Sequence, residues 1–461
     1  MLDKMLRFLS QNALVFWAGI GMGIYRSLHE WPVWYNNDVY HGSIGVLFSG
    51  SDFFILIDIG KIVGLLVYIS LCFVIDRERN RASLLLGPNI LSIVCLLVPV
   101  LQAMGIPVVQ QIMISALFGI GIATGMLFAQ WIEFFGTIPP VKVVQALAIS
   151  YVARFLLLPL FVTSVVLTDA LGILGMGILS TLILGWCVQQ TTTLPLALRQ
   201  FEPASKFWRR NGLLFLFVVL FACAYGLGSG VTDLSHAPME TGLGKVIPSL
   251  VVLILAFKLG DRFDRTILYA FALPLMAAGL LGVVFLGLPL SVSQVLLSAG
   301  FSMFHLLMYV TICSVAYRSR LSSMPAGVCV RVLALVAADL AILVFKILPD
   351  DAKGLCATIV VIVTIAVGFA TFLRPVDYGT FQSSFADSDT KEQLLLDLAR
   401  THGLSDRETT VFLLIREGKS ATQISEELFI SNGAVRSHSS RIYDKFGVHN
   451  RKDFDALFLY E

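Results

Sequence analysis

The C-terminal stretch Leu404–Val448 reads LSDRETTVFLLIREGKSATQISEELFISNGAVRSHSSRIYDKFGV, and it carries the start signals of short helices. Ser405 stands three residues before Glu408, and Ser420 stands three residues before Gln423, each pair ahead of an apolar run. This spacing is typical of a capping box, in which each residue of the pair bonds through its side chain to the other's backbone N–H group. The pattern predicts two helices that begin near these two serines.

Two more helices are expected further along the same stretch. One begins near Ser431 and ends at Gly447, because glycine readily adopts the left-handed conformation that ends many helices. The other begins at Asn450. Four short helices within residues 404–461, with a tight turn between the second and the third, predict a helix-turn-helix unit.

At the residue level this segment resembles the LuxR-type DNA-binding domain of bacterial regulators. The motifs that carry the resemblance are Leu404–Glu408, Gly418–Ile424, Leu428–Ser431, Ala434–His438 and Lys445–Val448, together with Arg451. Ala434 stands where the family has Thr, and Ser425 stands where it usually has Ala. The resemblance implies a domain at residues 404–461 that binds double-stranded promoter DNA. It leaves open whether the protein binds DNA as a homodimer.

The third predicted helix carries an apolar stripe of Val435, Ile442 and Phe446, and its opposite face is polar. That face would enter the major groove, where side chains reach the base edges. Residues 430–452 hold five basic residues and one acidic residue, although residues 374–461 hold 11 basic and 14 acidic residues. The local charge favours DNA, because phosphate attraction is short-ranged in cellular salt. The candidate DNA-binding residues are Thr422, Arg436, Ser437, Ser440, Arg441 and Lys445.

Two further side chains of this unit are expected to act within it. Glu408 should cap its helix and pair with a basic residue of the third helix. His438 lies beside the apolar stripe and should orient that helix rather than contact a base. The alternative for the whole unit is a structural bundle of four helices with no DNA-binding role.

Residues 374–403 are expected to form a linker ahead of this domain. The segment 374–390 is polar and contains Pro375 and Gly379, which break regular structure. A short amphipathic helix should follow at about 390–401.

Upstream of the linker, residues 1–373 have the composition of an integral membrane protein. The whole chain is 57% hydrophobic and only 14% charged, whereas soluble domains have about 25% charged residues. This excludes a disulfide-rich secreted protein, a disordered regulator and an ordinary cytosolic enzyme. A spanning helix needs about 20 mainly apolar residues. Twelve stretches qualify, with ten to thirteen as the acceptable range: 13–29, 53–75, 82–103, 108–132, 143–167, 170–190, 211–231, 246–259, 266–287, 290–317, 325–348 and 354–373. The eighth stretch is short, and the alternative for it is a start nearer Thr241.

The basic residues of the connecting segments predict the orientation of these helices. Short cytoplasmic loops are enriched in Lys and Arg. One alternating set of segments holds 16 basic residues, and the other set holds only Lys245 and Lys353. The asymmetry predicts a multi-pass protein of the cytoplasmic membrane with both termini in the cytoplasm.

The longest internal connection, 191–210, divides the membrane domain into two six-helix halves, 1–190 and 211–373. Each half has an acidic residue followed by Arg after its second helix, at Asp76–Arg77 and at Asp261–Arg262. Duplicated halves of this kind are a known transporter plan. The chain resembles the major facilitator fold, although the match to that fold's loop motif is partial. The alternative is that both loops are ordinary basic cytoplasmic loops.

Charged side chains inside a membrane are costly, and they mark functional or paired sites. The candidates for a small-molecule site around a central polar region are Asp58, Lys61, Arg154 and Asp339. The alternative is that they form structural ion pairs without a ligand. Arg331 and Lys346 are expected near helix ends with their heads at the interface, and Glu133 is expected at a cytoplasmic helix end.

The sequence contains no catalytic triad, phosphate-binding loop or metal-ligand spacing, so neither an enzyme nor a cofactor is predicted. We expect an all-α protein that acts as a membrane-embedded, one-component transcription regulator. Its helix bundle would sense an unknown small molecule, and its tail would bind promoter DNA. The alternatives are a secondary transporter with a DNA-binding regulatory tail, and a membrane anchor that binds no ligand.

Overall fold

The computed structural model describes sixteen segments of the chain, and every regular element in them is helical. The chain divides into two compact units, Met1–Arg374 and Pro375–Glu461. Most of the predicted linker 374–403 and both repeated acidic–Arg loops lie outside the described residues. The described residues are 12–34, 50–74, 81–104, 106–157, 166–191, 204–232, 238–260, 263, 266–319, 321–372, 395, 398–399, 402–416, 419–428, 430–448 and 451–456.

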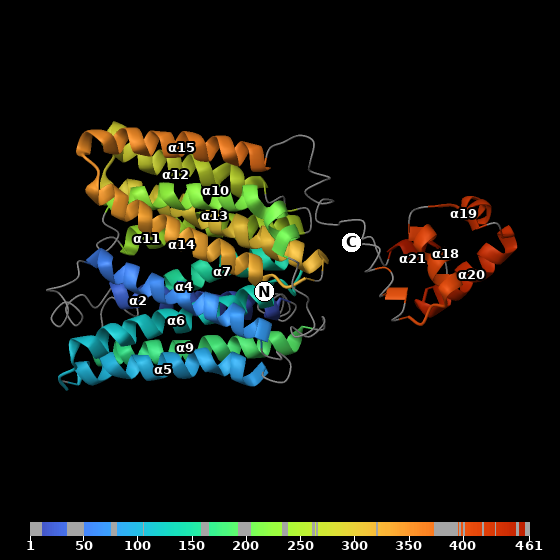
Figure 1. The fold of residues 1–461 in the computed structure, drawn as a ribbon, viewed down its shortest axis with the longest axis horizontal. Coiled ribbons are helices and arrows are strands. Elements are labelled where there is room, and N and C mark those ends of the chain that lie inside the picture. The colour runs from blue at the N-terminus through green and yellow to red at the C-terminus, as the bar shows by residue number, and fades with distance from the viewer. Residues whose placement is uncertain are drawn as a thin grey trace, which may run out of the picture. The chain divides into compact units, whose positions relative to one another are not determined.

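The first unit is a bundle of long helices (Figure 1). Its first half contains α2 (Ala13–Trp34), α4 (Gly50–Val74), α5 (Arg81–Ala103), α6 (Gln110–Phe135), α7 (Pro140–Leu157) and α9 (Val166–Gln190). Its second half contains α10 (Ala204–Thr232), α11 (Pro238–Leu259), α12 (Thr266–Leu286), α13 (Leu290–Ser319), α14 (Met324–Ile347) and α15 (Asp350–Phe372).

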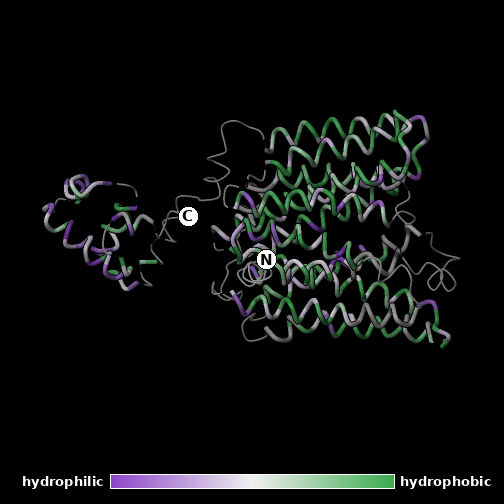
Figure 2. The backbone as a smooth tube through the Cα atoms, turned by 180° about the vertical axis from the view of Figure 1, so that it is seen from behind, coloured by the Kyte–Doolittle hydropathy of each residue, from purple (hydrophilic) through white to green (hydrophobic). Residues whose placement is uncertain are grey.

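Within the described residues, nine of these helices are long and apolar enough to cross a membrane: α4, α6, α7, α10, α11, α12, α13, α14 and α15. Hydrophobic residues occur along most of the length of the bundle helices (Figure 2). Many apolar side chains remain exposed on the outside of the unit, as lipid contact requires. A multi-pass membrane domain is therefore confirmed, and the count of twelve spans stays a prediction for α2, α5 and α9.

Close helix pairs build each half. In the first half α4 packs along α6, and glycines allow the contact: a Cβ atom added at Gly64 would collide with the carbonyl oxygen of Ile122. In the second half α10 packs along α14, and α12 packs along α13. The halves meet where α7 contacts α11 and α13, and where α14 contacts α4 and α6. These contacts join the two halves.

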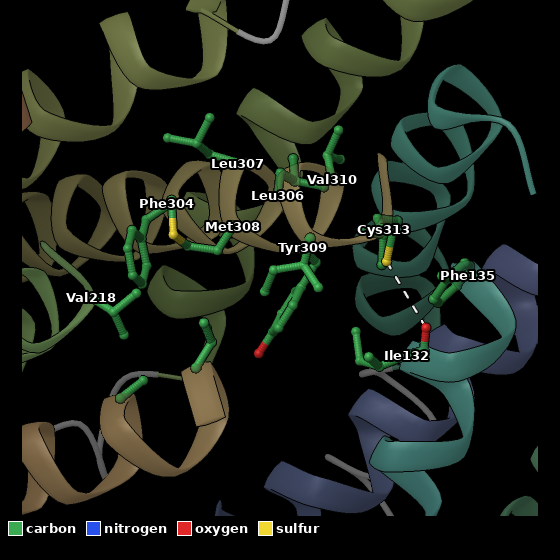
Figure 3. Packing of buried hydrophobic residues seen from close by; sticks show 14 of the residues in the cluster. Ile132, Phe135, Val218, Phe304, Leu306, Leu307, Met308, Tyr309, Val310 and Cys313 are labelled. Atoms are coloured by element: carbon green, nitrogen blue, oxygen red, sulfur yellow. Dashed lines mark hydrogen bonds between the residues drawn. The ribbon is translucent and has the colours of Figure 1, made fainter. Parts of the chain in front are cut away.

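One apolar core runs through both halves. Figure 3 shows Ile132 and Phe135 of α6 beside Cys313 of α13, whose thiol lies 4.0 Å from the Ile132 carbonyl oxygen. Further along α13, Phe304 stacks on Phe221 of α10 with ring centroids 4.2 Å apart. Since these side chains are almost fully buried, the two halves share a continuous interior.

The second unit contains α18 (Asp406–Arg416), α19 (Ala421–Leu428), α20 (Asn432–Lys445) and α21 (Arg451–Ala456). It has a hydrophobic core of its own, because a separate cluster of buried residues joins these helices to the preceding segment. The cluster contains Leu395, Ala399, Val411, Phe412, Leu414, Ile415, Ile424, Val435, Ile442 and Phe454.

The predicted capping boxes are present in this unit. The Ser405 N–H group donates to Glu408 Oε2 at 2.8 Å, and the Ser420 N–H group donates to Gln423 Oε1 at 2.8 Å. Ser431 caps α20 by accepting a hydrogen bond from the Ala434 N–H group at 3.2 Å. These contacts set the starts of the three helices where the sequence placed them.

Candidate nucleic-acid interface and charged cluster

Helix α20 separates an inner face from an outer face. Val435 and Ile442 are fully buried against α18 and α19, as predicted. The outer face carries four of the predicted DNA-binding side chains, all exposed: Arg436, Ser437, Ser440 and Arg441. Thr422 on α19 is also exposed. The structure thus brings four candidate residues onto one helix and leaves them accessible to a partner.

Lys445, the sixth candidate, makes contacts inside the unit. Its Nζ atom donates to Glu408 Oε2 at 2.7 Å and to the Gly403 carbonyl oxygen at 2.8 Å. The Lys445 side chain is 36% exposed, whereas that of Glu408 is only 6% exposed. The pair therefore ties the end of α20 to the start of α18.

Glu408 is held as a carboxylate by this arrangement. Two hydrogen bonds lower the pKa of Glu408 from 4.5 to about 2. The hydrogen bond from Lys445 has the larger effect, and the one from the backbone N–H group of Ser405 adds to it. Both donors stabilise the charged form more than the neutral form. The expected cap and the expected pairing with a basic residue of the third helix are both present.

Two contacts of the unit were not predicted from the sequence. The ring of His402 stacks on Phe446 with centroids 4.0 Å apart. Arg451 donates from Nη1 to the Lys419 carbonyl oxygen at 2.8 Å, which fixes the start of α21 against the α18–α19 connection. The sequence shows Arg451 only as a position that matches the LuxR-type pattern, because its partner is a backbone atom that no side-chain motif reveals.

In the helix bundle, three of the four predicted ligand-site residues lie together. Lys61 and Asp58 of α4 form an ion pair at 2.5 Å, and the Lys61 residue is only 2% exposed. Asp339 of α14 interacts electrostatically with both of them. Arg331 of α14 belongs to the same group through its interactions with Asp58 and Asp339. The expectation that Arg331 sits at a helix end was wrong, since it lies one-third of the way along α14.

The fourth predicted residue, Arg154 of α7, lies in a neighbouring basic group. It is 7% exposed and interacts with Arg26 of α2. Arg26 donates from Nε to Ser150 at 2.9 Å, and its guanidinium lies 4.0 Å above the ring of Tyr151. Arg26 was missed as a site residue, although an arginine inside an expected span was a signal for it.

Lys245 of α11 completes this basic group. The sequence placed it in an outer loop, but α11 begins at Pro238 and buries Lys245 to 7% exposure. Its electrostatic neighbours are Arg154, Arg26 and Arg331. The prediction was wrong because glycine and polar residues at the start of α11 lower the local hydropathy without ending the helix.

Glu133 joins the two halves at the end of α6. It is 2% exposed, and its Oε2 atom accepts hydrogen bonds from Ser322 Oγ at 2.7 Å and from the Met324 N–H group at 3.0 Å. Ser323, which precedes α14, makes no side-chain cap. A carboxylate of α6 therefore caps the first turn of α14; Glu133 lies near a helix end, as expected, and its side chain is buried there.

Replacing Glu133 by Ala should destabilise the bundle by about 1–3 kcal/mol, because the buried N–H group of Met324 would lose its acceptor. Thermal unfolding of the purified full-length protein in detergent measures this change. Glu133→Gln, which keeps an acceptor oxygen, should lose less. Equal melting temperatures for Glu133→Ala and the unmodified protein would contradict a capping role.

The C-terminal unit has known relatives. Residues 402–455 match the family model of the bacterial regulatory proteins of the luxR family. The transcriptional regulatory protein DesR of Bacillus subtilis is 40% identical over 60 residues, which is 13% of this chain and 30% of DesR. The fimbriae Z protein of Escherichia coli K12 is 39% identical over 59 residues, which is 13% of this chain and 28% of that protein. The chain thus spans less than a third of the length of the curated relatives it matches.

The helix bundle resembles a solved structure. The proton:xylose symporter XylE of the major facilitator superfamily, bound to 6-bromo-6-deoxy-D-glucose, aligns with a TM-score of 0.52 and 13% identity. The alignment covers 79% of this chain and 95% of the symporter. Such a likeness shows the fold alone. The two predicted resemblances are confirmed: residues 402–455 are similar to the luxR family of bacterial regulators, and the bundle is similar in fold to the major facilitator superfamily.

Proposed function

We propose that the protein is a membrane-embedded, one-component transcription regulator whose C-terminal unit binds promoter DNA. The observation that carries this proposal is the outer face of α20, which exposes Arg436 and Arg441 on a unit similar to the luxR family. Helices of this kind dock in the major groove with their exposed side chains toward the base edges. Ser437 and Ser440 lie on the same face, and Thr422 of α19 would contact the phosphate backbone.

Lys445 takes a supporting role in this proposal. Its ammonium group already bonds to Glu408 and Gly403, so it holds α20 in position for the groove. The sequence alone had suggested a DNA contact for Lys445. We assign the principal phosphate and base contacts to the exposed side chains of α20.

The test uses the fragment 386–461, which contains the whole second hydrophobic core. We expect the fragment to fold and to bind duplex promoter DNA, with an affinity that falls steeply as salt increases because phosphate contacts release counterions. Fluorescence anisotropy at several salt concentrations measures this dependence. A folded fragment with no affinity for its own promoter region at low salt would refute the proposal.

Arg436→Ala should weaken binding by about 1–3 kcal/mol and relax base preference if the guanidinium contacts a base edge. The measurement is binding of the fragment to target and to scrambled DNA, with circular dichroism to show that the fold is intact. Arg407→Ala is the matched control, because Arg407 is exposed on α18 and lies outside the proposed interface. Unchanged affinity and preference for Arg436→Ala would show that another face binds DNA.

The membrane domain would place this unit beside the chromosome. A DNA-binding tail works only in the cytoplasm, which agrees with the basic residues of the predicted cytoplasmic loops. Reporter fusions after Arg81 and Arg320 should therefore report the inside, and fusions after Asp38 and Asp169 the outside. An outside signal at Arg320 would overturn this orientation.

In this proposal the bundle senses a small molecule and biases the DNA-binding unit. The fold of the bundle also favours the alternative of a secondary transporter with a regulatory tail. Reconstituted vesicles distinguish the two, because a transporter moves its ligand across the membrane and a sensor binds it without net flux.

A further inference from the structure

The segment that precedes α18 belongs to the core of the C-terminal unit. Leu395 and Ala399 are buried, and both lie in the hydrophobic cluster of this unit. The Leu404 N–H group donates to the Ala399 carbonyl oxygen at 2.8 Å, and Gly403 between them has a φ of 64°. This bond across a left-handed residue is the usual end of a helix. The backbone around the next residue, His402, is therefore held against the core.

His402 contacts the C-terminal end of α20. Its ring stacks on Phe446, the residue that ends α20, with centroids 4.0 Å apart. Its Nδ1 atom lies 3.2 Å from the carbonyl oxygen of Lys445. A carbonyl oxygen only accepts, so Nδ1 carries the proton and donates. The last carbonyl groups of a helix lack the next turn as a partner, and His402 therefore caps the end of α20.

Both contacts of His402 act on the main body of the unit. Phe446 packs on Phe412 and Phe454, with ring centroids 5.4 Å and 5.2 Å apart. The hydrogen bond reaches the backbone of Lys445, so it holds α20 independently of the ammonium group of that residue. A displacement of His402 would therefore be felt by the helix itself.

The two ends of α20 are held by different parts of the chain. Ser431 caps its start, and His402 caps its end. The exposed Arg441 lies one turn before Lys445, next to the end that His402 holds. A base contact requires placement within about 0.5 Å, whereas attraction to phosphates falls gradually with distance. A small shift of this end should therefore cost base contacts more than phosphate contacts.

We propose that His402 is a positioning residue for DNA recognition, which sets the sequence preference of α20 without contacting DNA. The inference rests on the proposed function and adds to it a residue outside the outer face of α20. The segment that carries His402 thereby becomes part of the apparatus that reads the base sequence.

The experiment uses the full-length protein in detergent and a duplex that this protein selects from a pool of random sequence. Fluorescence anisotropy gives the affinity for the selected duplex and for a scrambled one, and their ratio is the readout. His402→Ala should lower this ratio by about tenfold, the order of magnitude for one lost base contact. The affinity for the scrambled duplex should change little. Hydrogen exchange at the amides of α18 shows that the unit remains folded.

His402→Phe separates the two contacts of the ring. It keeps a ring that stacks on Phe446 and removes the donor to the Lys445 carbonyl oxygen. This variant should keep the packing of the unit, and it should lose part of the sequence preference.

Thr410→Gly is the matched control for stability. The Thr410 hydroxyl donates to the Asp406 carbonyl oxygen at 2.9 Å, within α18 itself. Glycine there destabilises α18. A change in stability alone reduces the folded fraction, so both affinities should fall by the same factor and their ratio should stay constant.

Three results would overturn the inference alone. They are an unchanged ratio in both His402 variants, an equal fall of the ratio in Thr410→Gly, and a salt slope reduced by about one unit in His402→Ala. The last result would identify His402 as a phosphate contact. If the unmodified protein selects no duplex at all, the proposed function fails, and this inference fails with it.

Discussion

Val435→Asp should unfold the C-terminal unit and abolish its binding to DNA. Val435 is fully buried in the first turn of α20, in the core that joins this helix to α18 and α19. A buried carboxylate with no partner costs several kcal/mol, and a small domain has only about 5 kcal/mol of stability to lose. Circular dichroism and anisotropy on the fragment 386–461 should show loss of helix and of DNA binding together.

Ser437→Asp is the matched control. It introduces the same charge on the same helix, two residues after Val435, at a position that is exposed. This variant should keep its helix content and lose DNA affinity, since the new carboxylate would face the phosphates. The two variants thus separate folding from binding. If the Val435→Asp fragment folds, the face of α20 that carries Val435 does not pack against the core. If Ser437→Asp binds DNA normally, the outer face of α20 is not the DNA interface.

The C-terminal unit was predictable because its signals are local. A capping box uses residues three positions apart, so Ser405 with Glu408 and Ser420 with Gln423 set helix starts without knowledge of the fold. The alternation of buried and exposed positions on α20 follows from helical periodicity alone. The role of Lys445 was harder to predict, since its partner Glu408 is distant in sequence and a basic residue on this helix fits DNA equally well.

In the bundle, hydropathy predicted the long helices but not the partners of their charged residues. Glu133 lies near the end of an apolar run, where an interfacial position is the usual expectation, yet α14 covers it. Lys245 and Arg26 lie far apart in sequence and become neighbours only when α11 and α2 pack around α7. Such contacts depend on tertiary packing between the two halves, which composition and periodicity do not encode.

Glu408→Ala should cost the C-terminal unit on the order of 2–3 kcal/mol. The carboxylate accepts from the Ser405 N–H group and from Lys445, and both hydrogen bonds are charge-assisted. Urea unfolding of the fragment 386–461 measures the loss. Glu427→Ala is the matched control: Glu427 pairs with Lys419 at 2.6 Å, but its side chain is 46% exposed, and removal of such a pair costs about 0–1 kcal/mol. Equal losses in the two variants would contradict a special role for Glu408.

The same pair predicts a pH dependence of stability. The pKa of Glu408 is lowered from 4.5 to about 2 in the folded unit, so the unfolded chain takes up the proton more readily. Its contribution to stability is therefore complete above about pH 4.5 and is lost as the pH falls toward about 2. Glu408→Gln has no carboxylate to titrate. The difference in stability between the unmodified fragment and this variant should shrink over that window, and a constant difference would contradict the pairing.

A double-mutant cycle with Lys445→Met decides whether Lys445 supports the helix or contacts DNA. If the lysine acts through Glu408, the two substitutions should be strongly non-additive in unfolding free energy. The folded fragment with Lys445→Met should then retain most of its affinity for DNA. The salt dependence of that affinity should also persist, because the exposed residues of α20 still contact the phosphates. Lys445→Met could instead leave the unfolding free energy unchanged and reduce the slope of log DNA affinity against log salt concentration by about one unit. That result would identify Lys445 as a phosphate contact. The ammonium group lies 2.7 Å from a nearly buried carboxylate, and this geometry favours the first outcome.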